Sequence, residues 1–120
     1  MLSNTLLRIE TILMKKLNQQ TTNDVLDFLK NYKIDSWIYP GVLKRKFNLT
    51  IDEVYSILSD MENEGILQSY YELYCSHCQK SMGVVRLFNE LPENFMCELC
   101  DEKLYTLENT ILIYKVILDE

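Results

Sequence analysis

The chain has 120 residues, of which 48% are hydrophobic, and its formal net charge at pH 7 is −6. This length allows one compact domain, or a small domain with a metal-stabilised appendage. No apolar run approaches the length of a membrane-spanning helix, and charges interrupt the apolar pattern of the first segment, "MLSNTLLRIETILMKKLNQQ". We therefore expect an unexported, cytoplasmic protein that has no membrane partner.

The negative charge is concentrated in the second half of the chain. Residues 1–60 carry eight Lys or Arg and seven Asp or Glu, whereas residues 61–120 carry four and eleven. A large nucleic-acid footprint usually requires a basic face. The composition therefore disfavours extended nucleic-acid binding.

Apolar periodicity predicts two helices at the start of the chain. Leu6, Ile9, Leu13 and Leu17 recur at spacings of three and four and predict an amphipathic helix over residues 3–19. The polar stretch "QQTTND" then offers Thr22 or Asn23 as the N-cap of a second helix at about 24–32.

The next segment predicts a short strand, two helices and a longer strand. "SWIYPG" is expected to be extended before Pro40, which suits the first position of a short helix over residues 40–47. Thr50 and Glu53 form a capping box for a helix over 51–64 that ends at Gly65. Residues 66–74, "ILQSYYELY", are rich in aromatic side chains and are predicted to form a strand.

This order of elements resembles the winged helix-turn-helix family over residues 22–74. An unrelated small α+β domain is the alternative. The helix over 3–19 lies upstream of a minimal winged helix, so its apolar stripe must be covered elsewhere. It can dock on its own domain, form a homodimer with a second copy, or enter a groove on another protein.

All four cysteines lie in two CxxC pairs separated by 18 residues, Cys75/Cys78 and Cys97/Cys100. This spacing is typical of a zinc site, in which two turns together present four thiolates to one ion. Four sulfur ligands leave no open coordination position, so we predict a single structural zinc ion. A rubredoxin-like iron site and redox-active thiols are the rival hypotheses, and His77 is expected to be an exposed spacer.

The segment from Tyr74 to about Leu118 resembles the zinc-ribbon family, whose ligand positions match the four cysteines. "MGVVRLF" at 82–88 and "TILIYKVIL" at 110–118 read as strands, and "NELPEN" at 89–94 supplies a turn. The chain lacks the proline and glycine that often flank such cysteine turns. Together the resemblances imply an α+β fold. Residues 1–74 would form the amphipathic N-terminal helix plus the winged helix-turn-helix, packed on an antiparallel zinc ribbon with a C-terminal strand at 75–120.

A winged helix followed by a four-cysteine ribbon resembles the N-terminal half of the alpha subunit of the transcription factor E family. It also resembles, more loosely, small accessory subunits of bacterial multi-component systems, including those of phage defence. The likeness suits a winged helix that works through protein contacts. Our leading hypothesis is a non-enzymatic, zinc-stabilised adaptor that binds a larger protein, such as a nucleic-acid-handling complex.

The helix over 51–64 would read DNA in a winged helix, yet it has no Lys or Arg. Its candidate protein-binding residues are Asp52, Asp60, Glu62 and Glu64. The alternative hypothesis is a DNA-binding transcription regulator, for which the candidates are Lys44, Arg45, Lys46 and Asn63. No pair of acid, base or nucleophile groups is suggested, so we expect no enzymatic activity.

Overall fold

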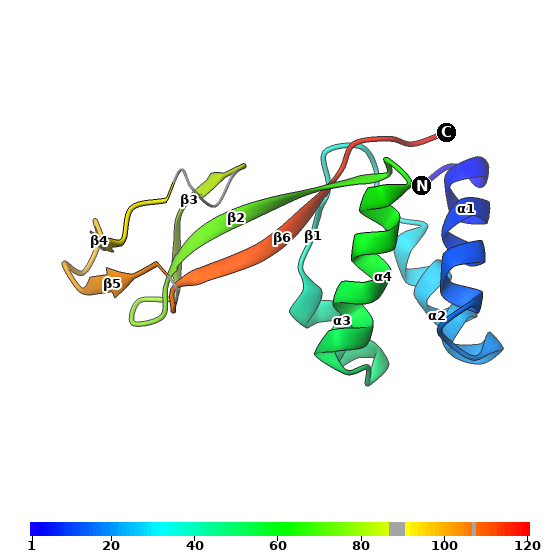
Figure 1. Cartoon of the computed structure of the whole chain (residues 1–120), viewed down its shortest axis with the longest axis horizontal. Helices are drawn as coiled ribbons and strands as arrows, with labels where there is room; N and C mark the ends of the chain where they lie inside the picture. The colour runs from blue at the N-terminus through cyan, green and yellow to red at the C-terminus, as the bar shows by residue number, and fades with distance from the viewer. Residues whose placement is uncertain (87–90, 107) are drawn as a thin grey trace. The chain divides into compact units, whose positions relative to one another are not determined.

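The computed structural model describes residues 1–86, 91–106 and 108–120, and it has an α+β fold (Figure 1). The chain forms two compact units: unit 1 comprises Met1–Gln68 and Tyr114–Glu120, and unit 2 comprises Ser69–Ile113. These units differ from the predicted division into residues 1–74 and 75–120, because the segment from Tyr114 onward belongs to unit 1. None of the described helices is long and apolar enough to cross a membrane.

Unit 1 contains the four described helices, α1 (Ser3–Met14), α2 (Gln19–Leu29), α3 (Pro40–Phe47) and α4 (Ile51–Asn63). Its core is made of large aliphatic side chains that are almost fully buried, including Ile9, Leu13, Leu29, Val54, Leu58 and Met61. Helix α1 packs against α2 and α4. The apolar stripe of α1 is therefore covered within its own unit, which was one of the three expected fates.

The first two helices differ from their predicted bounds. Helix α1 ends at Met14 instead of continuing to residue 19, and α2 begins at Gln19 instead of near residue 24. The reason is Asn18, whose side-chain oxygen accepts a hydrogen bond from the Thr21 N–H at 2.8 Å and caps α2. Such a local bond competes with continuation of the preceding helix. The predicted cap at Thr22 or Asn23 is thus wrong.

The segment from α3 to the end of α4 has the helices that the sequence predicts. Pro40 opens α3, and Asn48 adopts a left-handed conformation (φ 53°) that ends it. At the start of α4, the Glu53 N–H donates to Thr50 Oγ1 at 3.1 Å and the Thr50 N–H donates to Glu53 Oε1 at 3.0 Å. The predicted capping box is confirmed. Gly65, with φ 79°, follows the helix as expected of a helix-ending glycine.

A sheet has the strand order β1-β6-β2-β3 and includes residues of both units. Its strands are β1 (Trp37–Ile38), β2 (Leu67–Cys75), β3 (Lys80–Val85) and β6 (Thr110–Val116). β1 lies between α2 and α3 in the chain, and the other three strands follow α4. β1 pairs with β6 in the antiparallel sense, with Trp37 opposite Lys115. In unit 1, the Ile117 N–H donates to the Ile66 carbonyl at 2.9 Å. The buried side chains of Ile38, Ile66 and Val116 complete the core of unit 1.

Besides part of the β2–β6 pairing, unit 2 contains the antiparallel pairings of β2 with β3 and of β4 (Asn94–Met96) with β5 (Lys103–Tyr105). In the first of these, Glu72 lies opposite Val84. The predicted strand at 82–88 corresponds to β3 as far as Val85, and its residues 87 and 88 lie outside the described residues. The first two residues of the predicted turn at 89–94 also lie outside them.

We predict that Leu13→Ala lowers the free energy of unfolding of unit 1 by about 2–5 kcal/mol, because it opens a cavity beside α1. Leu7→Ala on the same helix is the matched control, since Leu7 is 61% exposed, and it should change stability by less than about 0.5 kcal/mol. Urea unfolding followed by the helical circular-dichroism signal measures both. Equal effects of the two substitutions would show that α1 is not part of the core.

Candidate metal centre

The four cysteine sulfurs of unit 2 form a tight cluster. All four Sγ atoms lie within 4.8 Å of one another, and none takes part in a disulfide. Cys75 Sγ is 3.7 Å from Cys100 Sγ, and Cys78 Sγ is 3.5 Å from Cys97 Sγ. Metal–sulfur bonds of about 2.3 Å in a tetrahedron would place the sulfurs about 3.8 Å apart. The observed spacing therefore fits one tetrahedrally coordinated ion.

Each cysteine pair lies in the turn of a hairpin. Cys75 ends β2, and the chain turns back so that Lys80 of β3 lies opposite it. Cys97 follows β4, and its N–H donates to the Glu102 carbonyl at 2.9 Å just before β5. The two CxxC turns thus belong to two different hairpins of the same unit.

The residue after each second cysteine has a left-handed backbone. Gln79 and Asp101 both have φ 58°. Glycine adopts this conformation most easily, which explains why glycine commonly follows such pairs. In this chain, side-chain-bearing residues adopt the same geometry at a cost of about 1–2 kcal/mol each. The missing glycine noted in the sequence therefore does not alter the turn conformation.

Backbone N–H groups point at the sulfurs in both turns. The Cys78 N–H donates to Cys75 Sγ at 3.5 Å. Around Cys97, burial opposes ionisation, but hydrogen bonds from the backbone N–H groups of Leu99 and Cys100 outweigh it and lower the pKa to about 7. Such N–H groups stabilise the thiolate, which is the form that binds a metal.

The other two cysteines discussed here, Cys78 and Cys100, resist ionisation when no cation is bound. Burial, followed by hydrogen bonds with the other three sulfurs, raises the pKa of Cys78 to about 12. The hydrogen bond from Glu102 favours the Cys100 thiolate, but burial and the neighbouring sulfurs outweigh it, and the pKa of Cys100 is raised. Four thiolates are therefore compatible with this site only when a positive ion is bound among them.

An apolar shell surrounds the sulfurs. Cys75, Cys97 and Leu104 are buried together, and the partly buried side chains of Met82 and Phe95 pack against them. His77 lies in the first CxxC turn but is exposed, and it is not part of the sulfur cluster. The expectation that His77 is a spacer is consistent with this placement. A closed set of four ligands in an apolar shell holds an ion without exposing it to a substrate.

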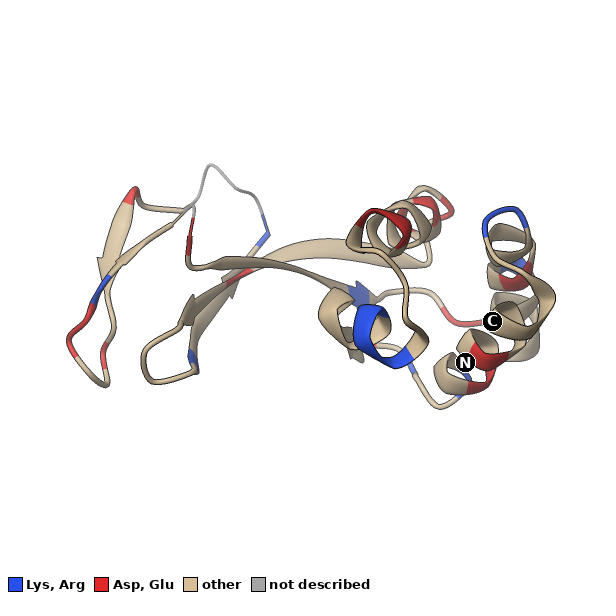
Figure 2. Cartoon of the chain, turned by 90° about the horizontal axis from the view of Figure 1, so that it is seen from below, with Lys and Arg blue, Asp and Glu red and all other residues tan. Residues whose placement is uncertain are grey.

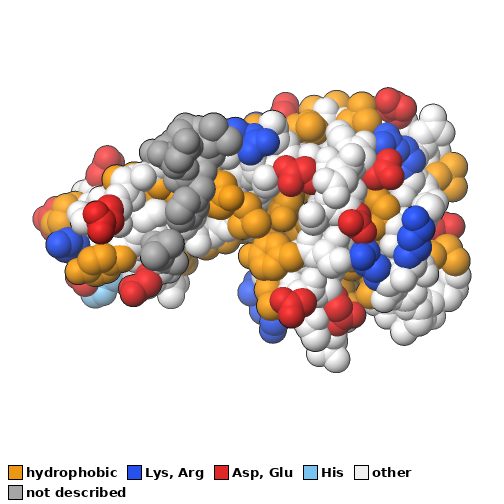
Figure 3. Space-filling view, in the orientation of Figure 1, with side chains coloured by type: hydrophobic (Ala, Val, Ile, Leu, Met, Phe, Trp, Pro, Cys, Tyr) orange, Lys and Arg blue, Asp and Glu red, His pale blue; other side chains and the backbone are white. Residues whose placement is uncertain are grey.

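The predicted acidic residues of α4 are not all free at the surface. Asp60 Oδ2 forms an ion pair with Lys16 Nζ, in the turn after α1, at 3.2 Å, and Glu64 Oε2, directly after α4, pairs with Arg8 of α1 at 3.1 Å. Lys16 also donates to Ser56 Oγ at 2.8 Å. On the face of unit 1 seen in Figure 3, acidic and basic side chains lie side by side. Of the other two acidic candidates, Asp52 is exposed and Glu62 is half-buried.

The sequence interpretation did not identify Arg8 and Lys16 as partners of α4. Ser56, Asp60 and Glu64 follow one another at intervals of four and form a single line on α4. Arg8 and Lys16 are two helical turns apart on the first predicted helix. They contact this line of residues at Glu64 and at Asp60 and Ser56, respectively. The matching intervals were visible in the sequence, but the pairing of α1 with α4 was not.

The predicted basic residues lie together on α3, beside the acidic residues of the neighbouring α4 (Figure 2). Lys44, Arg45 and Lys46 are all exposed. Lys46 Nζ lies 5.1 Å from the centre of the Phe28 ring, so part of its charge interacts within unit 1. Asn63, the remaining nucleic-acid candidate, is exposed at the end of α4.

No protein-family model, curated protein or solved structure matches this chain. What the cluster can bind therefore follows from its donor atoms. Four sulfurs in a tetrahedral arrangement suit zinc or iron, whereas magnesium and calcium require oxygen ligands. The four cysteines can hold one such metal ion.

We predict that the purified protein contains one metal ion per chain and that Cys97→Ser loses it, because three sulfurs leave the ion exposed and weakly held. His77→Ala is the matched control within the first pair and should retain a full equivalent. Elemental analysis measures the metal content and also identifies the ion. Full occupancy in Cys97→Ser would contradict the four-sulfur assignment.

Metal binding should also release protons. The raised pKa values of Cys78 and Cys100 keep both thiols protonated near pH 7, so each bound ion should displace more than one proton. Because protons compete with the metal, affinity should fall as the pH is lowered. Calorimetric titration of the reduced, metal-free protein with zinc, in two buffers of different ionisation enthalpy, gives the number released. A value near zero would mean that the thiols are already ionised.

Proposed function

We propose that this protein is a non-enzymatic adaptor: a winged helix whose cysteine-containing unit is held together by one zinc ion, and which acts by binding another protein. The observation that carries the proposal is the chemistry of α4. This helix would contact DNA in a winged helix, but it has no basic side chain, and α1 contacts one line of its surface. An acidic helix beside a second helix is unsuited to entering the negatively charged major groove.

The winged-helix part of the proposal is supported by the order of elements in unit 1. α3 and α4 are joined by a short turn at residues 48–50, and β1 precedes them in the chain. Strands β2 and β6 are neighbours in the sheet, and β6 also pairs with β1. We infer that β1, β2 and β6 are the three strands of the winged helix. The segment from Cys75, the last residue of β2, to the start of β6 includes all four cysteines and then takes the place of the wing.

This interpretation extends the winged helix beyond the region proposed from the sequence. That region ended at residue 74 and placed the cysteine segment after it. With β6 included, the cysteine segment is inserted within the winged helix instead of being appended to it. The strand β6 was recognised in the sequence as a strand, but its partners are distant in the chain.

Zinc is the ion that the site supports best. Its four ligands are thiolates, two of them fully buried, and an apolar shell surrounds them. Zinc accepts such a closed tetrahedral shell in structural sites and has no redox chemistry of its own. Iron is the other ion that takes these ligands. The residues that would hold the zinc are Cys75, Cys78, Cys97 and Cys100.

A role as a DNA-binding transcription regulator is the second candidate, and the exposed cations of α3 favour it. Three cations in one helical turn can contact phosphates in a salt-sensitive way. Cations at this position would hold a duplex without selecting its sequence, because α3 precedes the helix that reads bases. Asn63 alone would supply few base contacts. The acidic surface of α4 therefore favours the adaptor over the regulator.

We predict that the zinc-loaded protein does not bind labelled duplex or single-stranded DNA at near-physiological salt, as measured by fluorescence anisotropy. Weak binding at low salt should be lost in Lys44→Glu/Arg45→Glu. The control Lys15→Glu/Lys80→Glu makes the same change in net charge at other exposed positions. Binding that persists at physiological salt and depends on Lys44 and Arg45 would replace the adaptor proposal with the DNA-binding one.

A further inference from the structure

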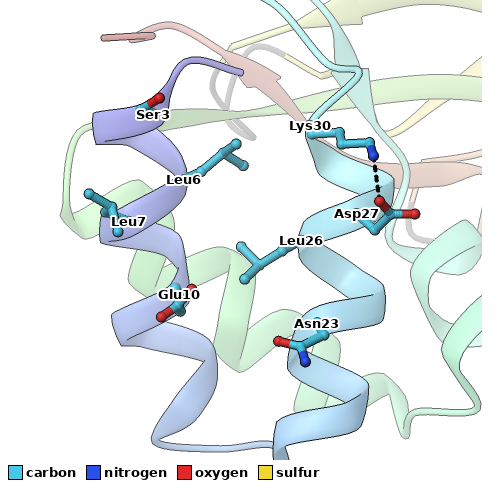
Figure 4. A pocket seen from close by; sticks show the side chains of 8 residues that line it. All are labelled: Ser3, Leu6, Leu7, Glu10, Asn23, Leu26, Asp27 and Lys30. Carbon is cyan, nitrogen blue, oxygen red and sulfur yellow. Dashed lines mark hydrogen bonds and ion pairs between the residues drawn. The ribbon is translucent and has the colours of Figure 1, made fainter.

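An open groove of about 470 Å³ runs between α1 and α2 in unit 1 (Figure 4). Its floor is apolar: Leu6 of α1 and Leu26 of α2 point toward one another across it, and both are half-buried. Leu7, on the rim, is 61% exposed. One exposed and two half-buried leucines grouped at a concave surface are unusual for an ordinary solvated face, where apolar side chains are scattered singly.

The length of the groove indicates the size of its occupant. The lining residues run from Ser3 to Glu10 on α1 and from Asn23 to Lys30 on α2. Each of these stretches is two helical turns long, or about 10 Å. A helix lying in such a groove would insert apolar side chains at positions i, i+3 or i+4, and i+7. Three leucines of unit 1 are available to contact them.

The walls of the groove carry negative charge on both sides. Glu10 lies on the α1 wall and has no ion pair or hydrogen bond with any described residue. Asp27 lies on the α2 wall and pairs with Lys30, three residues further along, but both side chains are more than half exposed. Exposed pairs of this kind contribute little and can be exchanged for another partner. The walls therefore complement a cationic ligand.

A second copy of the chain is a poorer match for these charges. A two-fold symmetric contact would bring the same groove from both copies together, so that each carboxylate of the walls would occur twice in one interface. The interface would then contain four carboxylates, Glu10 and Asp27 from each copy, but only two positive groups, the Lys30 side chains. Like charges across an interface act against its formation. The charges thus favour a different protein chain.

We propose that the α1–α2 groove is the docking site for an amphipathic helix of a partner protein, with leucine-like side chains on one face and Lys or Arg on its flanks. This inference rests on the adaptor function proposed above and names its surface. It moves the partner-binding site away from the predicted acidic face of α4, where Asp60 and Glu64 already pair with Lys16 and Arg8. The occupant's apolar residues would cover Leu6, Leu7 and Leu26, and its cations would meet Glu10 and Asp27.

Three designed peptides test this proposal with the full-length, zinc-loaded protein. The probe is a fluorescent 18-residue helix with Leu at positions i, i+3 or i+4, and i+7 and Lys on both flanks. One comparison peptide replaces every Lys by Glu, and another has the same Lys and Leu composition in an order that breaks the helical period. The Lys probe should bind, and both comparison peptides should bind at least about tenfold more weakly.

Substitutions in the groove then locate the binding. Leu7→Asn should weaken the Lys probe at least about tenfold. Glu10→Gln should weaken it about two- to fivefold and reduce its salt dependence. Met14→Asn is the matched control, because Met14 lies on the same helix, is 52% exposed and does not line the groove. Circular dichroism confirms that each variant keeps its helices.

Three results would overturn the proposal. The first is a Lys probe that binds Leu7→Asn as well as the unchanged protein, and the second is equal binding of the Lys and Glu peptides. The third is a concentration-dependent dimer, measured by light scattering, that Leu7→Asn abolishes, since a second copy would then occupy the groove. The DNA-binding assay tests the proposed adaptor function independently of the groove. If the peptide experiments contradict the groove proposal and no DNA binding is found, the protein would still be an adaptor, but one that binds its partner through another surface.

Discussion

Four thiols held within 4.8 Å of one another are the constraint on which unit 2 depends. Burial and mutual proximity raise the pKa of Cys78 to about 12, so the cluster resists ionisation unless a cation is present. The buried apolar group around the sulfurs is small, with Leu104 as its one fully buried non-cysteine member among the described residues. So small a core supplies little hydrophobic stabilisation, and coordination bonds to an ion held by the four cysteines would add to it. We therefore expect the folding of unit 2 to depend on metal binding.

Unit 1, in contrast, is stabilised mainly by the burial of apolar side chains. Its four described helices bury a conventional aliphatic core, and the ion pairs Arg8–Glu64 and Lys16–Asp60 lie at its surface. These pairs are partly exposed, so each contributes little to the free energy of folding. Their larger effect is on the surface charge, because Lys16 and Arg8 neutralise two carboxylates. The groove between α1 and α2, in contrast, keeps Glu10 available.

Local features of this chain were predictable from its sequence, whereas contacts between distant segments were not. The Thr50–Glu53 capping box, Pro40 at the start of α3 and the clustering of the four cysteines depend on short-range chemistry, and the structure has all three. The end of α1 was missed because Asn18 and Asn23 are both good caps, and only packing decides between them. The pairing of Lys16 with Asp60 joins residues that no local pattern relates.

The largest difference between the fold expected from the sequence and the structure lies in the pairing of β6 with β1 and β2. "TILIYKVIL" was expected to be a strand, and β6 occupies most of it. Nothing in its composition indicates that it pairs with β1, a two-residue strand near the start of the chain. Register between strands is set by the buried face and by the connecting turn, and here the connection is a whole compact unit. Sequence reasoning therefore placed the cysteine segment at the end of the fold.

The route of the chain through unit 1 has a consequence for how this protein can be redesigned. The chain leaves unit 1 at Gln68 and returns at Tyr114, on two strands that are neighbours in the sheet. Neighbouring antiparallel strands can be joined by a turn of two residues. Unit 2 thus has the connectivity of an insertion into a hairpin, and a short turn could take its place without interrupting any described helix. Other small folded units whose ends lie close together could be accepted at the same position.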